Sequence, residues 1–142
     1  MILVDANLLL YAENESDVMH LRARDWWVAQ LSGTETVCLP WLVLCAFIRI
    51  GTSPRVFPKA LSMSDAIARV QDWVEWPNVR VIAEAPTHWQ TLRLLLEDSG
   101  ARGNLVTDAH LAAMAIDHGC ELCSVDRDFA RFKRLKWRDP LE

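Results

Sequence analysis

The segment Ile2-Leu3-Val4-Asp5-Ala6-Asn7-Leu8-Leu9 combines an apolar run, a carboxylate and the beginning of a helical pattern. We expect a short buried strand that ends at Asp5 and turns directly into a helix over residues 7–12. A carboxylate at the end of a buried strand loses hydration, which costs several kcal/mol unless a partner compensates it. The segment alone leaves three compensations open: helix capping, a salt bridge and a bound metal ion.

The composition is that of a globular protein. Its 142 residues are 51% hydrophobic and 24% charged, which suits one domain over residues 1–142 with a proper core. No apolar run approaches the roughly 20 residues of a membrane helix. Asp5 interrupts the region where a secretory signal carries its basic and apolar parts. We therefore expect a cytoplasmic protein with no membrane partner.

Apolar strands and helices alternate along the rest of the chain. The expected helices cover residues 18–31, 41–50, 62–76, 86–97 and 107–118, and the expected strands 35–39, 79–82, 122–125 and 135–137. Ser16 or Asp17 is the expected N-cap of the first of these helices, and Thr107 that of the last. The run 41–50 is apolar except for Arg49 and indicates a buried helix. The alternation predicts an α/β fold with a mostly parallel central sheet and helices on both faces.

The cysteine pair Cys120-x-x-Cys123 has the spacing of some zinc and redox sites. However, residues 121–125 have the pattern of a buried strand, and no second pair with histidine spacing accompanies them. We interpret both thiols as core residues.

Carboxylates gather at one expected edge of the sheet. Asp5 ends the first strand, Asp126 and Asp128 follow the strand over 122–125, and Asp108 lies in the first turn of a helix. Sites in parallel sheets form beyond the carboxyl ends of the strands. Each acid alone has a structural explanation as a helix cap, a first-turn residue or a turn residue. Together they repel one another, so we expect all four to bind a hard cation, Mg²⁺ or Mn²⁺.

Three short blocks carry a resemblance to a known family. They are residues 5–9 (Asp-Ala-Asn-Leu-Leu), residues 104–113 (Asn-Leu-Val-Thr-Asp-Ala-His-Leu-Ala-Ala) and residues 124–129 (Ser-Val-Asp-Arg-Asp-Phe). In this order and spacing they resemble the motifs of PIN-domain nucleases and, more narrowly, of VapC, the toxin half of VapBC toxin–antitoxin modules. The resemblance covers essentially the whole chain. It implies a single PIN domain, a three-layer sandwich that hydrolyses RNA phosphodiester bonds with a divalent metal.

The same resemblance assigns roles to individual residues. It implies that Asp5, Asp108 and Asp126 are catalytic, with Asp5 as the central metal ligand and Asp108 as its partner. Asp126 and Asp128 bind a second ion or orient water. The supporting hydrogen-bond donors and acceptors are Asn7, Thr107 and Ser124. The family also implies a homodimer and a VapB-type antitoxin whose arginine enters the carboxylate cluster.

The sequence departs from the family pattern in one helix. Many PIN domains carry a glutamate after the second strand, but residues 44–49 contain no acid, and Ala46 or Phe47 stands in its place. This leaves open a single-ion mechanism, a second ion recruited only with RNA, or a weakened enzyme. The alternative function is a PIN-like domain that binds RNA or a partner without cutting. A phospho-acceptor receiver domain would need a lysine near the acids, whereas Lys133 and Lys136 lie in a basic tail segment.

The basic residues are unevenly distributed. A formal net charge of −4 argues against a general nucleic-acid coat, but six of the fifteen basic residues lie within 127–138. Taken alone, this segment is explained as a solvent-exposed surface. If an acidic site lies beside it, the segment would instead guide the backbone of an RNA substrate. The RNA-binding residues expected on that basis are Arg49, Arg127, Arg131 and Lys133. For Arg49 the alternative to a phosphate contact is a salt bridge to a carboxylate of the site.

Overall fold

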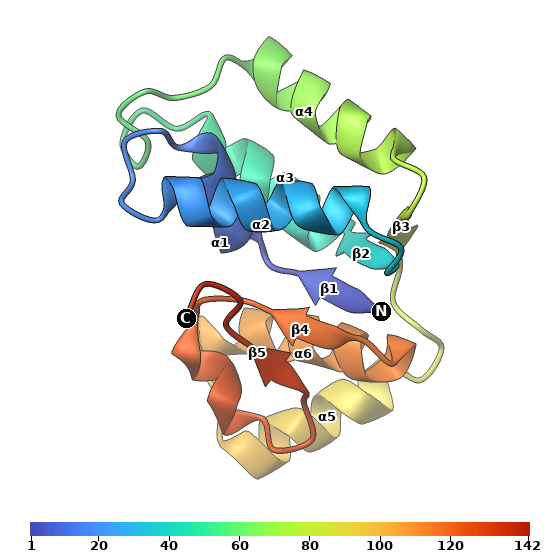
Figure 1. Ribbon diagram of the computed structural model, residues 1–142. Coiled ribbons are helices and arrows are strands. Elements are labelled where there is room, and N and C mark those ends of the chain that lie inside the picture. Colours follow the sequence, from blue (N-terminus) through green and yellow to red (C-terminus); the bar gives the residue numbers. More distant parts are fainter.

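The computed structural model describes every residue from Met1 to Glu142. Five strands form one sheet in the order β3-β2-β1-β4-β5 (Figure 1). The strands are β1 (Ile2–Val4), β2 (Val37–Pro40), β3 (Val79–Ile82), β4 (Glu121–Cys123) and β5 (Trp137–Arg138). Every neighbouring pair is parallel, so the predicted parallel sheet is confirmed.

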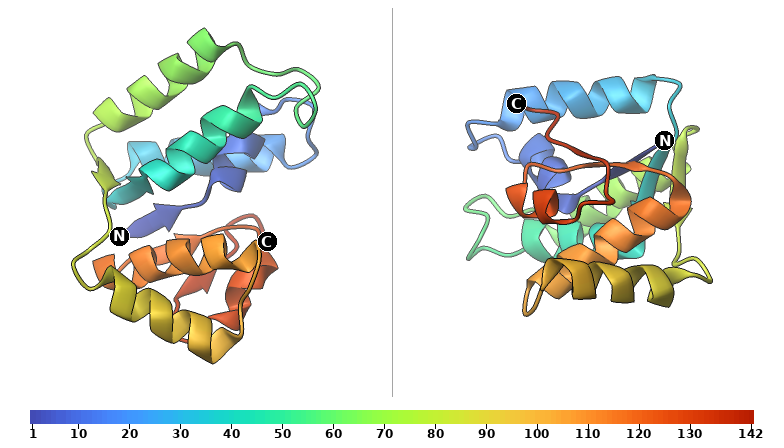
Figure 2. Two further views of the ribbon diagram at one scale, coloured as in Figure 1. Left: turned by 180° about the vertical axis from the view of Figure 1, so that it is seen from behind. Right: turned by 90° about the horizontal axis from the view of Figure 1, so that it is seen from below.

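Six α-helices and one short 3-10 helix surround the sheet. They are α1 (Ala6–Glu13), α2 (His20–Ser32), α3 (Trp41–Gly51), α4 (Met63–Glu75), α5 (His88–Ser99), α6 (Leu105–His118) and the 3-10 helix η1 (Arg127–Arg131). Helices α1 to α4 gather around the β2–β3 half of the sheet, and α5, α6 and η1 around the β4–β5 half (Figures 1 and 2). Seen from below, α2 and α5 lie on opposite sides of the strands (Figure 2).

Strand β1 lies at the centre of the core. Ile2 is 1% exposed and Leu3 and Val4 are fully buried. Since successive strand residues point to opposite faces, their burial means that both faces of the sheet are covered. β1 pairs with β2 through Ile2 and Val37, and with β4 along its whole length. The chain after β1 therefore emerges at the carboxyl edge of the sheet, beside the end of β4.

Two helices begin elsewhere than their expected caps. Neither Ser16 nor Asp17 caps α2, because Asp17 accepts a hydrogen bond from the Met19 amide in a preceding turn and the helix begins at His20. Thr107 does not cap α6 either, since the helix begins two residues earlier, at Leu105. A competing local turn and an extra half-turn of helix explain the two errors.

The prediction that α3 is buried is half wrong. Val43, Leu44 and Phe47 face the core, whereas Trp41 is 56% exposed and Cys45 is also exposed. An apolar helix normally buries its whole circumference, so the exposed apolar face needs another explanation.

Two strands have other ends than expected, whereas the cysteines agree with the prediction. β4 ends at Cys123 instead of Val125, and the last strand covers Trp137–Arg138 instead of residues 135–137. Cys120 and Cys123 are both free and buried, which confirms that they are core thiols.

Candidate metal centre and adjoining groove

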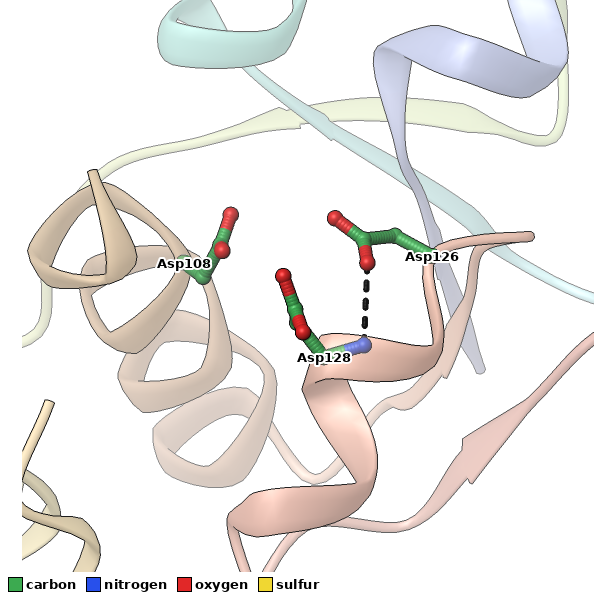
Figure 3. A group of neighbouring side chains, drawn as sticks. All are labelled: Asp108, Asp126 and Asp128. Carbon is green, nitrogen blue, oxygen red and sulfur yellow. Dashed lines mark hydrogen bonds between the residues drawn. The ribbon is translucent and has the colours of Figure 1, made fainter.

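Three carboxylates converge at the carboxyl edge of the sheet. Asp108 comes from α6, Asp126 from the turn after β4, and Asp128 from η1 (Figure 3). Each offers an oxygen, and these oxygens lie within 4.8 Å of one another. Asp126 Oδ1 also accepts a hydrogen bond of 2.9 Å from the Asp128 amide, which caps η1. Two chain segments remote in sequence thus build one acidic cluster.

Asp5 lies beside this cluster and is held in a different way. Its Oδ1 accepts a hydrogen bond of 2.7 Å from the Ala6 amide, which makes Asp5 the N-cap of α1. Its Oδ2 accepts hydrogen bonds from the Ser124 hydroxyl (2.7 Å) and the Asn7 amide (3.2 Å). Helix capping is therefore one of the interactions that compensate the lost hydration of the Asp5 carboxylate. Burial nevertheless outweighs these hydrogen bonds and raises the pKa of Asp5, and the charge of Asp126 acts in the same direction.

Ser124 connects Asp5 to the cluster. It is fully buried, and its hydroxyl donates to Asp5 while accepting from Asn7 (3.0 Å) and from the Asp126 amide (3.1 Å). Both of its lone pairs and its proton are thus used, which fixes the ends of β1 and β4 relative to each other. Thr107 lies on the groove beside Asp108 but makes no side-chain hydrogen bond to a carboxylate of the cluster.

The electrostatics of the cluster favour a bound cation. Burial, followed by the charges of Asp126, Asp5 and Asp128, raises the pKa of Asp108 to about 6, while Arg131 acts in the opposite direction. Such repulsion is relieved by a proton or by a cation. All the available donors are oxygens, so the residues fit a hard divalent ion and do not fit zinc.

We predict that Asp108→Asn stabilises the metal-free protein at neutral pH. The folded-state pKa of Asp108, about 6, lies above its ordinary value of 3.8. The folded protein therefore holds this proton more tightly, and its stability falls as pH rises through that interval. With allowance for solvent screening, we expect a gain on the order of 1 kcal/mol at pH 7.5, or about 2–4 °C in Tm.

Thermal unfolding in chelator at pH 7.5 and pH 4 checks this prediction. At pH 4 the gain should vanish, because Asp108 is then largely protonated in the folded protein. Asp25→Asn, on the exposed face of α2, is the matched control. An equal gain at both pH values would contradict an electrostatic origin.

A groove of about 690 Å³ opens next to the cluster. Asp5 and Asp108 line one side of it, and the exposed face of α3 forms an apolar wall with Trp41 and Ala46. This wall explains why the apolar face of α3 is left uncovered by the rest of the fold. Of the two candidate positions on α3, Ala46 lines the groove with Asp5 and Asp108, whereas Phe47 packs against Trp73 in the core, with ring centroids 4.7 Å apart.

The expected RNA-binding residues lie in different environments. Arg49 lines the groove and forms no ion pair, so the alternative of a salt bridge to a site carboxylate is wrong. Arg131 Nη2 is 3.9 Å from Asp128 Oδ1 at the edge of the cluster. Arg127 is paired with Glu142, whereas Lys133 is exposed and unpaired.

Two further polar groups of the groove are not among the site residues expected from the sequence. They are Glu84 and His110, whose side chains contact each other. Glu84 lies two residues after β3, so the rule that selected Asp126 at the carboxyl end of a strand also selects Glu84. No sequence signal pairs it with His110.

The parallel sheet and the acidic cluster at its carboxyl edge agree with the family to which sequence comparison assigns this chain. The PIN domain family model matches residues 2–135, and the chain belongs to this family. The chain is 43% identical to ribonuclease VapC33 of Mycobacterium tuberculosis over 141 residues, covering 99% of both proteins. It is 39% identical to ribonuclease VapC37 of the same organism, covering 99% of this chain and 97% of that protein.

Solved structures show the same fold. VapBC-1 from nontypeable Haemophilus influenzae matches with a TM-score of 0.70 and 18% identity over 100% of both chains. Mycobacterium tuberculosis VapC20, described as a sarcin–ricin loop cleaving toxin, matches with a TM-score of 0.67 and 21% identity, covering 92% of this chain and 93% of that one. The predicted PIN-like architecture is therefore confirmed.

Proposed function

We propose that this chain is an endoribonuclease toxin of the VapC type that depends on a divalent metal and is neutralised by a VapB-type antitoxin. The observation that carries the proposal is the convergence of Asp108, Asp126 and Asp128 beside an open groove. The 43% identity to a VapC ribonuclease along the whole chain supports the choice of RNA as substrate.

The proposed roles follow from the positions of the side chains. Asp108, Asp126 and Asp128, together with the neighbouring Asp5, would hold Mg²⁺ or, as an alternative, Mn²⁺. A bound ion of this kind lowers the pKa of water and neutralises charge that develops on phosphoryl oxygens. Ser124 keeps the Asp5 carboxylate oriented and supplies it with a hydrogen bond.

Cationic side chains flank the acids on two sides. Arg49 lies in the groove and Arg131 at the cluster. In this proposal both bind phosphates of the RNA backbone, and Arg127 in η1 and Lys133 just after it extend the basic surface. The negative cluster itself repels RNA, so these residues supply the attraction before the metal and the phosphate meet.

A partner is expected as well as a substrate. The VapBC2 complex of Rickettsia felis and FitAB of Neisseria gonorrhoeae are among the structures that share this fold. An antitoxin arginine placed among Asp108, Asp126 and Asp128 would neutralise the cluster as a cation does. The exposed Trp41 and Trp89 offer anchors for an antitoxin or for a second copy of the chain. None of the helices is long and apolar enough to cross a membrane.

A second candidate function rests on Ala46. This residue lines the groove with the acids, where many PIN domains carry a glutamate, so the alternative is a domain that binds RNA or a partner without cutting. Calorimetric titration with Mn²⁺, with and without RNA, separates the two functions. A silent metal titration in both cases favours the binder.

Sequencing the RNA ends produced by the purified protein tests the nuclease. We expect cuts that require Mg²⁺ or Mn²⁺, disappear in chelator and leave a 5′-phosphate and a 3′-hydroxyl. Asp5→Asn purified in parallel controls for contaminating nucleases. Cleavage that persists in chelator, or that is equal in the variant, would refute the proposal.

A further inference from the structure

A chain of polar contacts leads from the interior between α5 and α6 to the groove. Thr91 donates to Asp117 Oδ1 (2.6 Å), and Asp117 Oδ2 lies 4.0 Å from His88 Nδ1. His88 Nε2 is 3.2 Å from His110 Nδ1, and His110 Nε2 is 3.1 Å from Glu84 Oε1. The Asp117 side chain is only 6% exposed, whereas that of Glu84 is 51% exposed. The contacts therefore run from a buried anchor to a group that solvent or substrate can reach.

The number of hydrogens on each group determines which atom donates in each of these contacts. A carboxylate only accepts, so His110 Nε2 must carry the hydrogen that is shared with Glu84. His110 Nδ1 then accepts from His88 Nε2–H, and His88 Nδ1 is left with a lone pair. His88 Nδ1 and Asp117 Oδ2 are both buried without a hydrogen-bond partner.

The charge states agree with this arrangement. Burial and the neighbouring His110 lower the pKa of His88, which keeps its ring neutral at physiological pH. A hydrogen bond from its own backbone amide, and a further one from His110, lower the pKa of Glu84, which keeps the carboxylate ionised. The groove is therefore lined by an N–H donor and a carboxylate acceptor that are hydrogen-bonded to each other.

We propose that Glu84 and His110 form a subsite that recognises a ribose 2′-hydroxyl of the RNA. This inference rests on the proposed ribonuclease function. In the free protein the single Nε2–H of His110 is donated to Glu84. A hydroxyl both donates and accepts, so on binding it replaces this direct contact: it accepts from His110 Nε2–H and donates to the Glu84 carboxylate. A phosphate has no hydrogen to offer Glu84 and is repelled by its charge, so it does not fit this pair.

The location of the pair suits this role. Glu84 and His110 line the same groove as Asp5 and Asp108. In RNA the 2′-hydroxyl and the 3′-phosphate are attached to neighbouring carbons of one ribose. A phosphate held at the acidic cluster therefore brings a hydroxyl into the groove. His88 acts as a positioning residue, because its contact with His110 Nδ1 leaves the hydrogen of His110 on Nε2.

The test uses a short oligoribonucleotide that contains a cleavage site found by RNA-end sequencing. A series of versions carries a single 2′-deoxy residue at successive positions, and kcat/KM is measured for each. Water is the nucleophile in metal-assisted hydrolysis, so removal of one hydroxyl reports recognition and leaves the chemistry intact. We expect one position at which the deoxy residue lowers kcat/KM about tenfold or more.

Substitutions assign this loss to the two side chains. Glu84→Ala and His110→Asn should abolish the 2′-deoxy penalty, whereas Glu97→Ala, on exposed α5, should leave it unchanged. His110→Gln should retain part of the penalty, because its amide nitrogen takes the place of Nε2, while asparagine reproduces only Nδ1. If the two side chains had a purely structural role, their substitution would lower kcat/KM for the RNA and for the deoxy substrate by the same factor. The ratio of the two kcat/KM values would then be unchanged.

The outcomes separate this inference from the function on which it rests. RNA cleavage with no sensitive 2′-position, or with a penalty that survives Glu84→Ala, overturns the subsite and leaves the nuclease standing. Failure of the wild-type protein to cut any RNA with Mg²⁺ or Mn²⁺ overturns both.

Discussion

Replacing Asp5 or Asp108 by asparagine lowers metal-dependent RNA cleavage on the order of a thousandfold or more, while the fold is retained. Each substitution preserves the shape of the side chain and removes one negative charge from the edge of the cluster. The charge of Asp5 contributes to the raised pKa of Asp108, and a bound cation relieves this repulsion while both groups stay ionised. Loss of a charge that stabilises a transition state typically costs 10²–10³-fold in rate, and loss of the metal costs more.

Cleavage of a defined RNA at saturating Mn²⁺ is the measurement, with circular dichroism to confirm folding. Asp25→Asn controls for a change of net charge, since its side chain is exposed on α2. Asp5 is the more informative position. An asparagine there still accepts from the Ala6 amide through its single oxygen, so the cap of α1 survives, although its amide nitrogen can no longer accept from Ser124 and Asn7. Full activity in either variant would remove that residue from the proposed centre.

Glutamate introduced at two adjacent positions of α3 should give opposite results. At position 46 the new carboxylate faces Asp5 and Asp108 across the groove. We expect Ala46→Glu to raise the Mn²⁺ affinity about tenfold or more, because the charge count of the ligands sets affinity for hard cations. Without metal the same change should lower stability at neutral pH, because it adds a further like charge.

Phe47→Glu should unfold the protein. Phe47 is fully buried and packs against Trp73. Loss of a buried aromatic ring costs about 3–5 kcal/mol, and an unpaired buried carboxylate adds several more, against a typical total stability of about 5–15 kcal/mol. Calorimetric titration and thermal unfolding of the two variants are the measurements. Equal stability of the two would show that the register of α3 is misassigned.

Much of the fold and of the acidic centre was predictable because both depend on local patterns. The sequence shows which residue lies at the carboxyl end of each strand, and in a parallel sheet all these ends lie at the same edge. Asp126 and Asp128 were therefore placed beside Asp5 from their positions after buried strands. Asp108 was the exception, since it belongs to a helix and its approach to the cluster depends on how α6 packs against η1.

The sequence by itself determined the alternation of strands and helices along the chain, the parallel sheet and the acids at its carboxyl edge. It could do so because strand and helix periods are properties of neighbouring residues. Only the tertiary structure decided which face of α3 is covered, since a helix that is apolar all round carries no signal of its inward side. It also decided the contact between His88 and His110, which are separated by 22 positions and meet because α5 packs on α6. The role of Asp5 was likewise decided in three dimensions. The same carboxylate caps α1 and lines the groove, and Ser124, one residue after β4, helps to hold it there with a hydrogen bond from a distant part of the chain.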